Sequence, residues 1–161
     1  MHYCCYIFRQ SREEASHLLT LLISATLKLI KPYAVLLLKV LLLKANDASP
    51  VIAGQVLMCL GELSSVGGEE FVPYIDQIMA VILSTLRDPT ALSKREAALS
   101  TLGQLCTNTS YVITPIIDYP QLMPLLGHIL KTEPSTVVRR QAIKVFGILG
   151  AIDPYRRKVC P

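Results

Sequence analysis

Leu60-Gly61-Glu62-Leu63, Leu102-Gly103-Gln104-Leu105 and Phe146-Gly147-Ile148-Leu149 repeat one short pattern three times. The shared glycines, at 61, 103 and 147, stand 42 and 44 residues apart. A period in this range is typical of stacked helical pairs. One such pair cannot bury its apolar face alone and must pack on its neighbours. The pattern therefore predicts an all-α, right-handed solenoid of about three helical pairs, whose function lies in its surfaces rather than in a catalytic site.

The residues around each glycine form an apolar face at helical spacing. In the third unit this face consists of Val138, Ala142, Val145, Phe146 and Leu149. The matching positions of the other two units are apolar as well, except for Lys94 and Thr101 in the second unit. Glycine inside a helix costs about 0.5–1 kcal/mol relative to alanine. We therefore expect the three shared glycines to let a neighbouring helix approach closely.

Polar residues that precede prolines predict where the second helix of each unit begins. The pairs are Ser49-Pro50, Asp88-Pro89, Glu133-Pro134 and Asp153-Pro154, an arrangement typical of an N-cap followed by the first helical residue. Because Glu133 is a poor cap, Ser135 is an alternative to it. Gly67-Gly68 predicts the end of the first of these helices.

The repeat divides the chain into units. Residues 1–10 fit no repeat and are left unassigned, either disordered or an extra piece of helix. The second helix of a preceding unit is expected at 11–30, complete units at 31–68, 69–110 and 119–152, and the start of a further unit at 154–161. First helices are expected at 33–44, 69–87 and 119–131. Since neither end has the polar outer face of a terminal repeat, we expect the stack to continue beyond both.

Composition excludes several classes of function. Hydrophobic residues make up 52% of the 161 residues, and the net charge of +4 is too small to predict nucleic-acid binding. The five cysteines form no C-x-x-C pair and no zinc-ligand spacing, which favours a reducing, intracellular compartment. No Walker A, Gly-rich phosphate loop, D-F-G or H-E-x-x-H sequence is present, and the histidines stand alone. We expect no enzyme activity, cofactor or metal in this chain.

Residues 18–43 are apolar enough to suggest a membrane-associated helical protein. Lysines and Pro32 divide the stretch into pieces of at most about a dozen apolar residues, short of the ~20 that a spanning helix needs. Two amphipathic or buried helices that meet near Pro32 explain it better, so we expect no transmembrane segment.

The second helices also carry a family pattern. Arg95-x-x-Ala98-x-x-x-Leu102-Gly103 and Arg139-x-x-Ala142-x-x-x-Phe146-Gly147 resemble HEAT repeats, which belong to the armadillo-type folds. The first unit departs from the pattern, with Ala53 and Val56 where arginine and alanine are expected. HEAT patterns occur in many unrelated scaffolds, among them nuclear transport adaptors and phosphatase regulatory subunits.

Longer stretches of the sequence resemble one family among the HEAT-repeat proteins. The stretches 39–47, 61–63, 101–105 and 149–155 together resemble the N-terminal HEAT solenoid of the target-of-rapamycin (TOR) serine/threonine-protein kinases. The resemblance covers about residues 11–159. It implies a non-catalytic scaffold segment, because the kinase domain of that family lies far downstream. It also implies a role in nutrient and growth signalling, with TOR-complex subunits and adjoining HEAT repeats of the same chain as partners. The implied location is the cytoplasm, with endomembranes or the nucleus as further locations of a TOR complex.

Two sets of residues are candidates for specific roles. Arg95 and Arg139 follow the acidic residues Asp88 and Glu133, and in HEAT repeats such acid and arginine positions resemble a ladder that links neighbouring units. The row pointing away from the core changes sign along the stack, which suits a protein partner better than nucleic acid. Its basic residues gather toward the C-terminus, where we place a partner-facing surface at Arg140, Lys144, Arg156, Arg157 and Lys158.

Overall fold

The computed structural model describes residues 2–109 and 114–150, and every regular element in that part of the chain is a helix. The elements are α1 (His2–Ala25), α2 (Leu27–Ile30), η1 (Lys31–Tyr33), α3 (Ala34–Lys44), α4 (Pro50–Gly67), η2 (Gly68–Tyr74), α5 (Ile75–Arg87), α6 (Leu92–Asn108), α7 (Thr114–Asp118), α8 (Leu122–Thr132) and α9 (Thr136–Gly150). The all-α fold class is confirmed.

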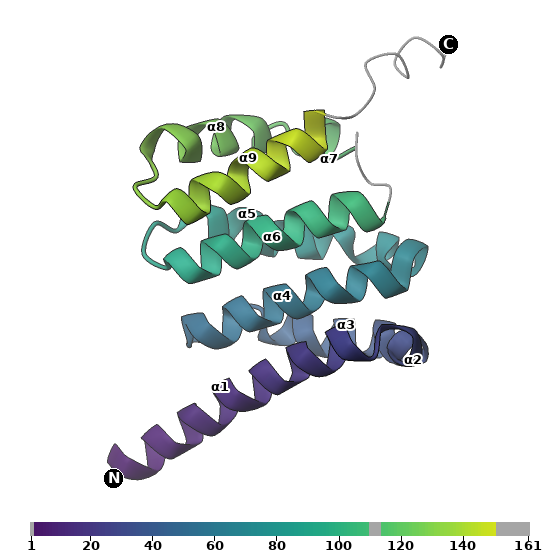
Figure 1. Ribbon diagram of the computed structural model, residues 1–161, viewed down its shortest axis with the longest axis vertical. Helices are drawn as coiled ribbons and strands as arrows, with labels where there is room; N and C mark the ends of the chain where they lie inside the picture. The colour runs from purple at the N-terminus through teal and green to yellow at the C-terminus, as the bar shows by residue number, and fades with distance from the viewer. Residues whose placement is uncertain (1, 110–113, 151–161) are drawn as a thin grey trace.

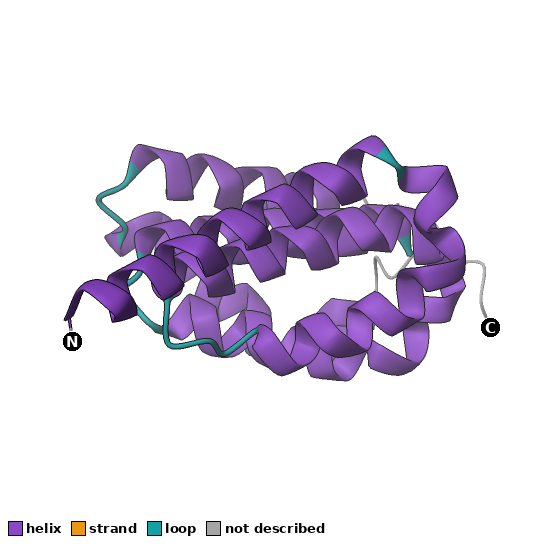
Figure 2. Cartoon of the chain, turned by 90° about the horizontal axis from the view of Figure 1, so that it is seen from below, coloured by secondary structure: helices purple, strands orange, loops and turns teal. Residues whose placement is uncertain are grey.

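The helices form two layers (Figures 1 and 2). Helices α1, α4, α6 and α9 lie side by side in one layer, in that order, and α3, α5 and α8 form the other. Each second helix also packs on the first helix of its own unit, as α4 does on α3 and α6 does on α5. The core lies between the layers, where the apolar faces meet. Its largest fully buried side chains are Phe71, Ile23, Leu38, Leu57, Leu60, Leu63, Ile78, Met79, Ile82, Leu86, Leu99 and Leu102.

Several helix boundaries differ from the predicted ones. Residues 2–10 form the first turns of α1, which is the helical alternative for this segment. The helix expected at 11–30 ends at Ala25, because Thr26 leaves the helical conformation and its hydroxyl donates to the Leu22 carbonyl at 2.6 Å. Such back-bonding often bends a helix. In the first helix of the second unit, Pro73 lacks an amide hydrogen, and a 3-10 segment therefore precedes α5.

The starts of the second helices follow their capping chemistry. Helix α4 begins at Pro50, as predicted. Pro89, in contrast, is not the first residue of α6. The Asp88 carboxylate accepts bonds from the amide and the hydroxyl of Thr90 and holds 89–90 in a turn, so that the helix begins at Leu92. In the third unit the Val138 amide donates to the Ser135 hydroxyl at 3.5 Å, which confirms Ser135 as the alternative cap.

Gly67 and Gly68 end α4 as predicted, each for its own reason. Gly68 has φ +49°, a conformation that side chains rarely adopt. Gly67 lies against the Phe71 ring, where a Cβ atom would come within 2.1 Å of a ring carbon. The chain therefore turns sharply into the other layer and seats Phe71 in the core.

One helical run is long and apolar enough to cross a membrane by composition alone. It is Pro50–Arg87, with a window of mean hydropathy 1.4 that is 61% buried inside the structure. The run comprises α4, η2 and α5, which turn back at Gly68 from one layer to the other. The core accounts for its apolar character. Residues 18–43, which suggested a membrane segment, are divided among α1, α2, η1 and α3.

Candidate interaction surfaces

The repeat glycines lie where the second helices touch. A Cβ atom on Gly61 would stand 3.3 Å from the Thr101 Cα atom and 2.0 Å from the Gln104 side-chain oxygen of α6. One on Gly103 would stand 3.2 Å from Ile148 of α9. The predicted close approach is therefore confirmed at these two seams.

Gly147 differs from the other two repeat glycines. No described atom outside its own helix lies within 4 Å of the place where its Cβ atom would stand, and the residue is exposed. The third repeat position therefore has the same residue as the other two but no neighbouring helix in the described part of the chain.

Side-chain hydrogen bonds join α4 to α6 at intervals of one repeat. The Thr101 hydroxyl donates to the Leu57 carbonyl at 2.6 Å, the Gln104 amide to Glu62 at 2.8 Å and the Asn108 amide to the Ser64 hydroxyl at 3.0 Å. The partners stand 42 or 44 residues apart in sequence. This explains why Thr101 interrupts an apolar face, since its hydroxyl is satisfied by the neighbouring unit. We did not predict these bonds, although pairing polar residues one period apart would have found them.

One arginine of the family pattern links neighbouring units, but its partner is not the acid that precedes it in sequence. Arg95 of α6 forms a salt bridge with Glu133, which lies 38 residues later in the turn before α9. Arg95 is 7% exposed and Glu133 4% exposed, so both charges are buried. Ala98 and Ala142, the small residues of the same pattern, are completely buried.

A second rung joins α1 to the first unit, where Arg12 forms a salt bridge with Asp47. Between the two rungs the ladder has a gap, because Ala53 occupies the arginine position in α4. Asp88, the acid that would complete this middle rung, is fully exposed. The hydrogen bond from Thr90 lowers the pKa of its carboxyl group below the usual range.

In the layer of first helices, a side-chain hydrogen bond between neighbouring units was not predicted. The Tyr119 hydroxyl donates to the Asp76 carboxylate of the preceding unit. Partial burial, and then the bond to Asp76, raise the pKa of the Tyr119 hydroxyl above its usual value. The bond ties the start of the third unit to α5.

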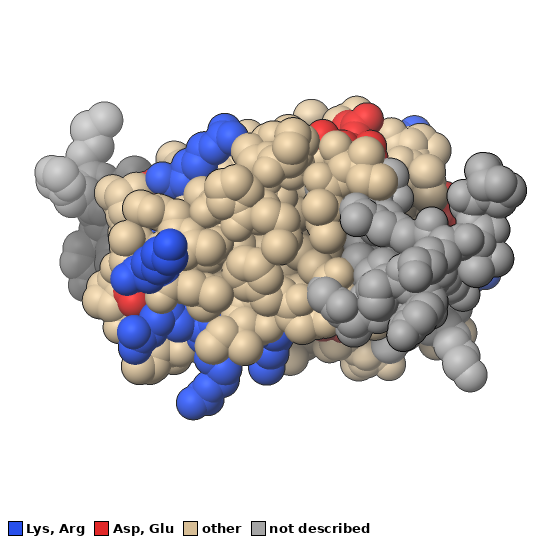
Figure 3. Space-filling view, turned by 90° about the horizontal axis from the view of Figure 1, so that it is seen from above, with Lys and Arg blue, Asp and Glu red and all other residues tan. Residues whose placement is uncertain are grey.

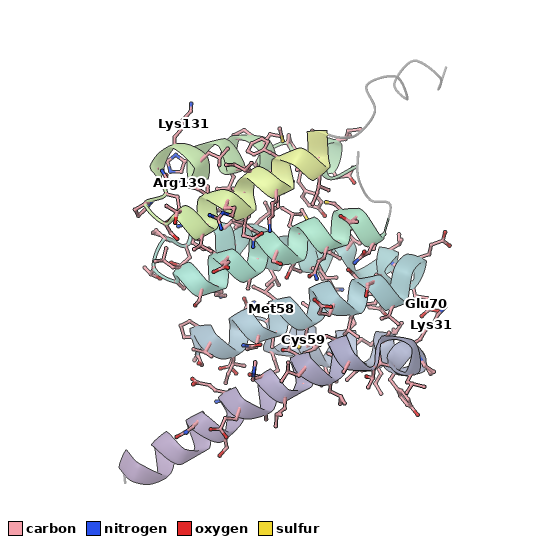
Figure 4. The ribbon with its side chains drawn as sticks, in the orientation of Figure 1. Lys31, Met58, Cys59, Glu70, Lys131 and Arg139 are labelled. Carbon is pink, nitrogen blue, oxygen red and sulfur yellow. The ribbon has the colours of Figure 1, made fainter. Side chains whose placement is uncertain are left out.

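Helix α9 exposes positions that the earlier units cover. Leu57 and Leu99 are completely buried, whereas Ile143 at the same repeat position is 60% exposed. Arg139, the counterpart of Arg95, is exposed as well and forms no ion pair with any described residue. Figure 4 places Arg139 and Lys131 at the same end of the molecule, where α8 turns into α9.

The predicted partner-facing residues fall into two groups. Arg140 and Lys144 are exposed on α9, and Lys144 lines a shallow groove of about 500 Å³ along α4, α6 and α9. Figure 3 shows the molecule from the α8–α9 end of the stack, and on the surface seen there most of the Lys and Arg side chains gather toward one side. Arg156, Arg157 and Lys158 lie outside the described residues.

Cys59 and Cys106 are buried, and their thiols have raised pKa values. For Cys106, burial raises the pKa to about 12 from 9.0. Burial also raises the pKa of Cys59, whose sulfur lies 3.2 Å from the Thr20 hydroxyl (Figure 4). Within residues 2–109 and 114–150 no group of three His, Cys, Asp or Glu side chains could hold a metal ion.

We predict that Cys106 resists iodoacetamide at pH 8 in the folded chain and reacts fully in denaturant, because only the thiolate is nucleophilic. Peptide mass mapping measures the modified fraction at this cysteine. Since its pKa is higher in the folded state, its contribution to stability is complete below pH 9 and is lost as the pH rises toward about 12. Rapid alkylation under native conditions would contradict the burial.

Two family models match the chain. One, described as a HEAT-like repeat, matches residues 54–105, which contain most of α4, all of α5 and most of α6. The other, described as the serine/threonine-protein kinase mTOR domain, matches residues 112–161, which include α7 to α9.

Three of the relatives that the chain matches are TOR kinases. It is 44% identical over 149 residues to the serine/threonine-protein kinase TOR2 of Saccharomyces cerevisiae, 42% over 147 to tor1 of Schizosaccharomyces pombe and 40% over 152 to TOR of Arabidopsis thaliana. These alignments cover 91–92% of the chain and 6% of each relative. The chain therefore spans about 6% of the length of the curated relatives that it matches.

Proposed function

The chain belongs to the TOR serine/threonine-protein kinase family, as part of its HEAT-repeat region, and we propose that it is a non-catalytic scaffold segment of such a kinase. In this role it supports the assembly of TOR complexes in nutrient and growth signalling. The matched part of the relatives is the HEAT-like region and not the kinase domain. The relatives are TOR kinases, which gives no support to a nuclear transport adaptor or a phosphatase regulatory subunit.

The α9 end of the stack supports this proposal most directly. Ile143, Gly147 and Arg139 repeat positions that a neighbouring unit buries in α6. A helical pair packed on α9 as α9 packs on α6 would cover Ile143 and approach Gly147. It would also bring an acidic residue to Arg139. We propose that an adjoining HEAT repeat of the same protein occupies this face.

The layer of second helices supports a contact with a different protein. Its groove has Glu62 on α4 and Lys144 on α9, so that the charge changes sign along its length. A nucleic-acid track would be basic in every unit. We propose that Arg140 and Lys144 face a subunit of a TOR complex, and that the chain resides in the cytoplasm, at endomembranes or in the nucleus as part of that complex.

A chimaera tests the scaffold role. In it, this chain replaces the matching segment of S. cerevisiae TOR2, to which it is 44% identical. We expect the chimaera to co-purify with the same subunits as its parent. Arg140→Glu together with Lys144→Glu should lower the recovery of one subunit by at least about ten-fold, since losing a complementary charge pair across an interface costs about 1.4 kcal/mol or more. Quantitative mass spectrometry of the purified complex provides the measurement.

Lys131→Glu is the matched control, because it reverses an exposed charge on α8, in the other layer. It should leave the subunits unchanged. Equal recovery of every subunit from the double variant and from this control would show that Arg140 and Lys144 are only solvated. A chimaera that folds but recovers no parental subunit would contradict the scaffold role itself.

A further inference from the structure

Helix α3 and the last residue of η1, Tyr33, present a row of large apolar side chains to solvent. Leu36 is 63% exposed, Leu43 is 83% exposed, and Tyr33 and Val40 are more than half exposed. The row is separate from the buried face of α3, which consists of Ala34, Leu38 and Leu41. We call these four exposed residues, Tyr33, Leu36, Val40 and Leu43, the α3 ridge.

Comparison with α5 indicates that the solenoid does not need this ridge. Pro32-Tyr33 aligns with Pro73-Tyr74, and the buried positions of α3 then fall on buried positions of α5. At the positions of Leu36 and Leu43, α5 has Gln77 and Ser84, both exposed. Polar residues therefore suffice at these two positions.

A preceding repeat would leave the same two leucines uncovered. Helix α5 already has a unit before it, and Lys39 of α3 lies 5.8 Å from the centre of the Tyr74 ring. Gln77 and Ser84 nevertheless remain exposed. A unit packed on α3 in the same way could cover Tyr33 and Val40, whose counterparts Tyr74 and Val81 are half-buried, but not Leu36 or Leu43.

The charged residues of the ridge's own elements, from α2 to the end of α3, have one sign. Between positions 27 and 46 the sequence contains lysines and no Asp or Glu. Lys31, Lys39 and Lys44 are exposed beside the ridge residues. A partner that buries the ridge must therefore bring acidic groups to its flanks.

We propose that the α3 ridge docks an amphipathic helix of a partner protein whose apolar stripe is flanked by acidic residues. The ridge residues follow one another at intervals of 3, 4 and 3, the spacing at which one helix packs along another. A second copy of this chain would set lysines against lysines. A helix that binds a bilayer surface inserts a broad apolar face into it. The ridge is too narrow for this, because it is a single row along a helix of 11 residues.

Two synthetic helical peptides of about three heptads test the proposal, both with leucine at the a and d positions. One has glutamate and the other lysine at the e and g positions. We expect the 161-residue chain to bind the glutamate peptide at least about ten-fold more tightly in fluorescence anisotropy, and less tightly at high salt. Leu36→Gln with Leu43→Ser, the residues that α5 has, should weaken binding by about ten-fold or more.

The control Leu92→Gln removes another exposed leucine, 49% exposed, from α6 in the other layer and should leave binding unchanged. Lys39→Glu with Lys44→Glu should reverse the preference between the peptides. Equal affinity of the ridge variant and this control would overturn the proposal. So would ridge-dependent binding to phosphatidylserine vesicles without peptide binding, or ridge-dependent dimerisation in sedimentation velocity. The ridge lies in the other layer from Arg140 and Lys144, so its test and that of the scaffold role can fail separately.

Discussion

Glu133→Ala should lower the free energy of unfolding by about 3–5 kcal/mol, the largest effect we expect from any single substitution in this chain. The substitution leaves the Arg95 guanidinium buried without its counter-charge. Arg95→Ala should cost a similar amount, because it strands the carboxylate instead. Urea denaturation followed by circular dichroism measures both values.

The control and the double variant separate loss of the pair from loss of packing. Arg139→Ala removes the same repeat residue from an exposed site and should change stability by less than about 0.5 kcal/mol. Arg95→Met with Glu133→Leu should recover most of the loss, since well-packed apolar residues often replace a buried pair without cost. If Glu133→Ala proved as mild as Arg139→Ala, the rung would contribute nothing to the stack.

Gly61→Leu should lower the free energy of unfolding by about 1–3 kcal/mol, through overpacking of the seam between α4 and α6. The new side chain meets Thr101 and Gln104, and the Thr101 contact is with backbone, which cannot rotate away. Gly147→Leu at the same repeat position meets no described atom. It should instead gain up to about 1 kcal/mol from helix propensity. Thermal denaturation of the two variants gives the comparison.

The two glycine variants should change the free energy of unfolding in opposite directions, and this difference tests whether the seam is the cause. If both lowered stability equally, the cost would come from the helix itself and not from the seam. Gly103→Leu should behave like Gly61→Leu, because α9 covers Gly103 through Ile148. A neutral result at Gly103 would therefore also contradict close approach as the role of these glycines.

Local sequence predicted the helices well where capping and apolar spacing agreed. It failed where side chains competed with the helix for backbone groups. Asp88 holds a turn that delays α6, and α1 ends early at Thr26, which leaves the helical conformation while its hydroxyl bonds to the Leu22 carbonyl. Both effects depend on conformations that a proline or an apolar period does not encode. The acid partner of Arg95 was also not identified from sequence, since it lies one repeat away rather than in the preceding turn.

The sequence by itself determined the all-α solenoid and the positions of its seams, because a period of 42–44 residues with a shared glycine fixes which residues are equivalent. The resemblance to the family came from the longer stretches around the repeat. Only the tertiary structure decided what each equivalent residue does. Leu99 is buried and Ile143 exposed, and Arg95 is paired whereas Arg139 forms no ion pair within residues 2–109 and 114–150. Within one helix these positions look alike. Their burial is set by the neighbouring unit, whose residues lie a whole repeat away. The free energy of packing between units therefore cannot be predicted from local sequence.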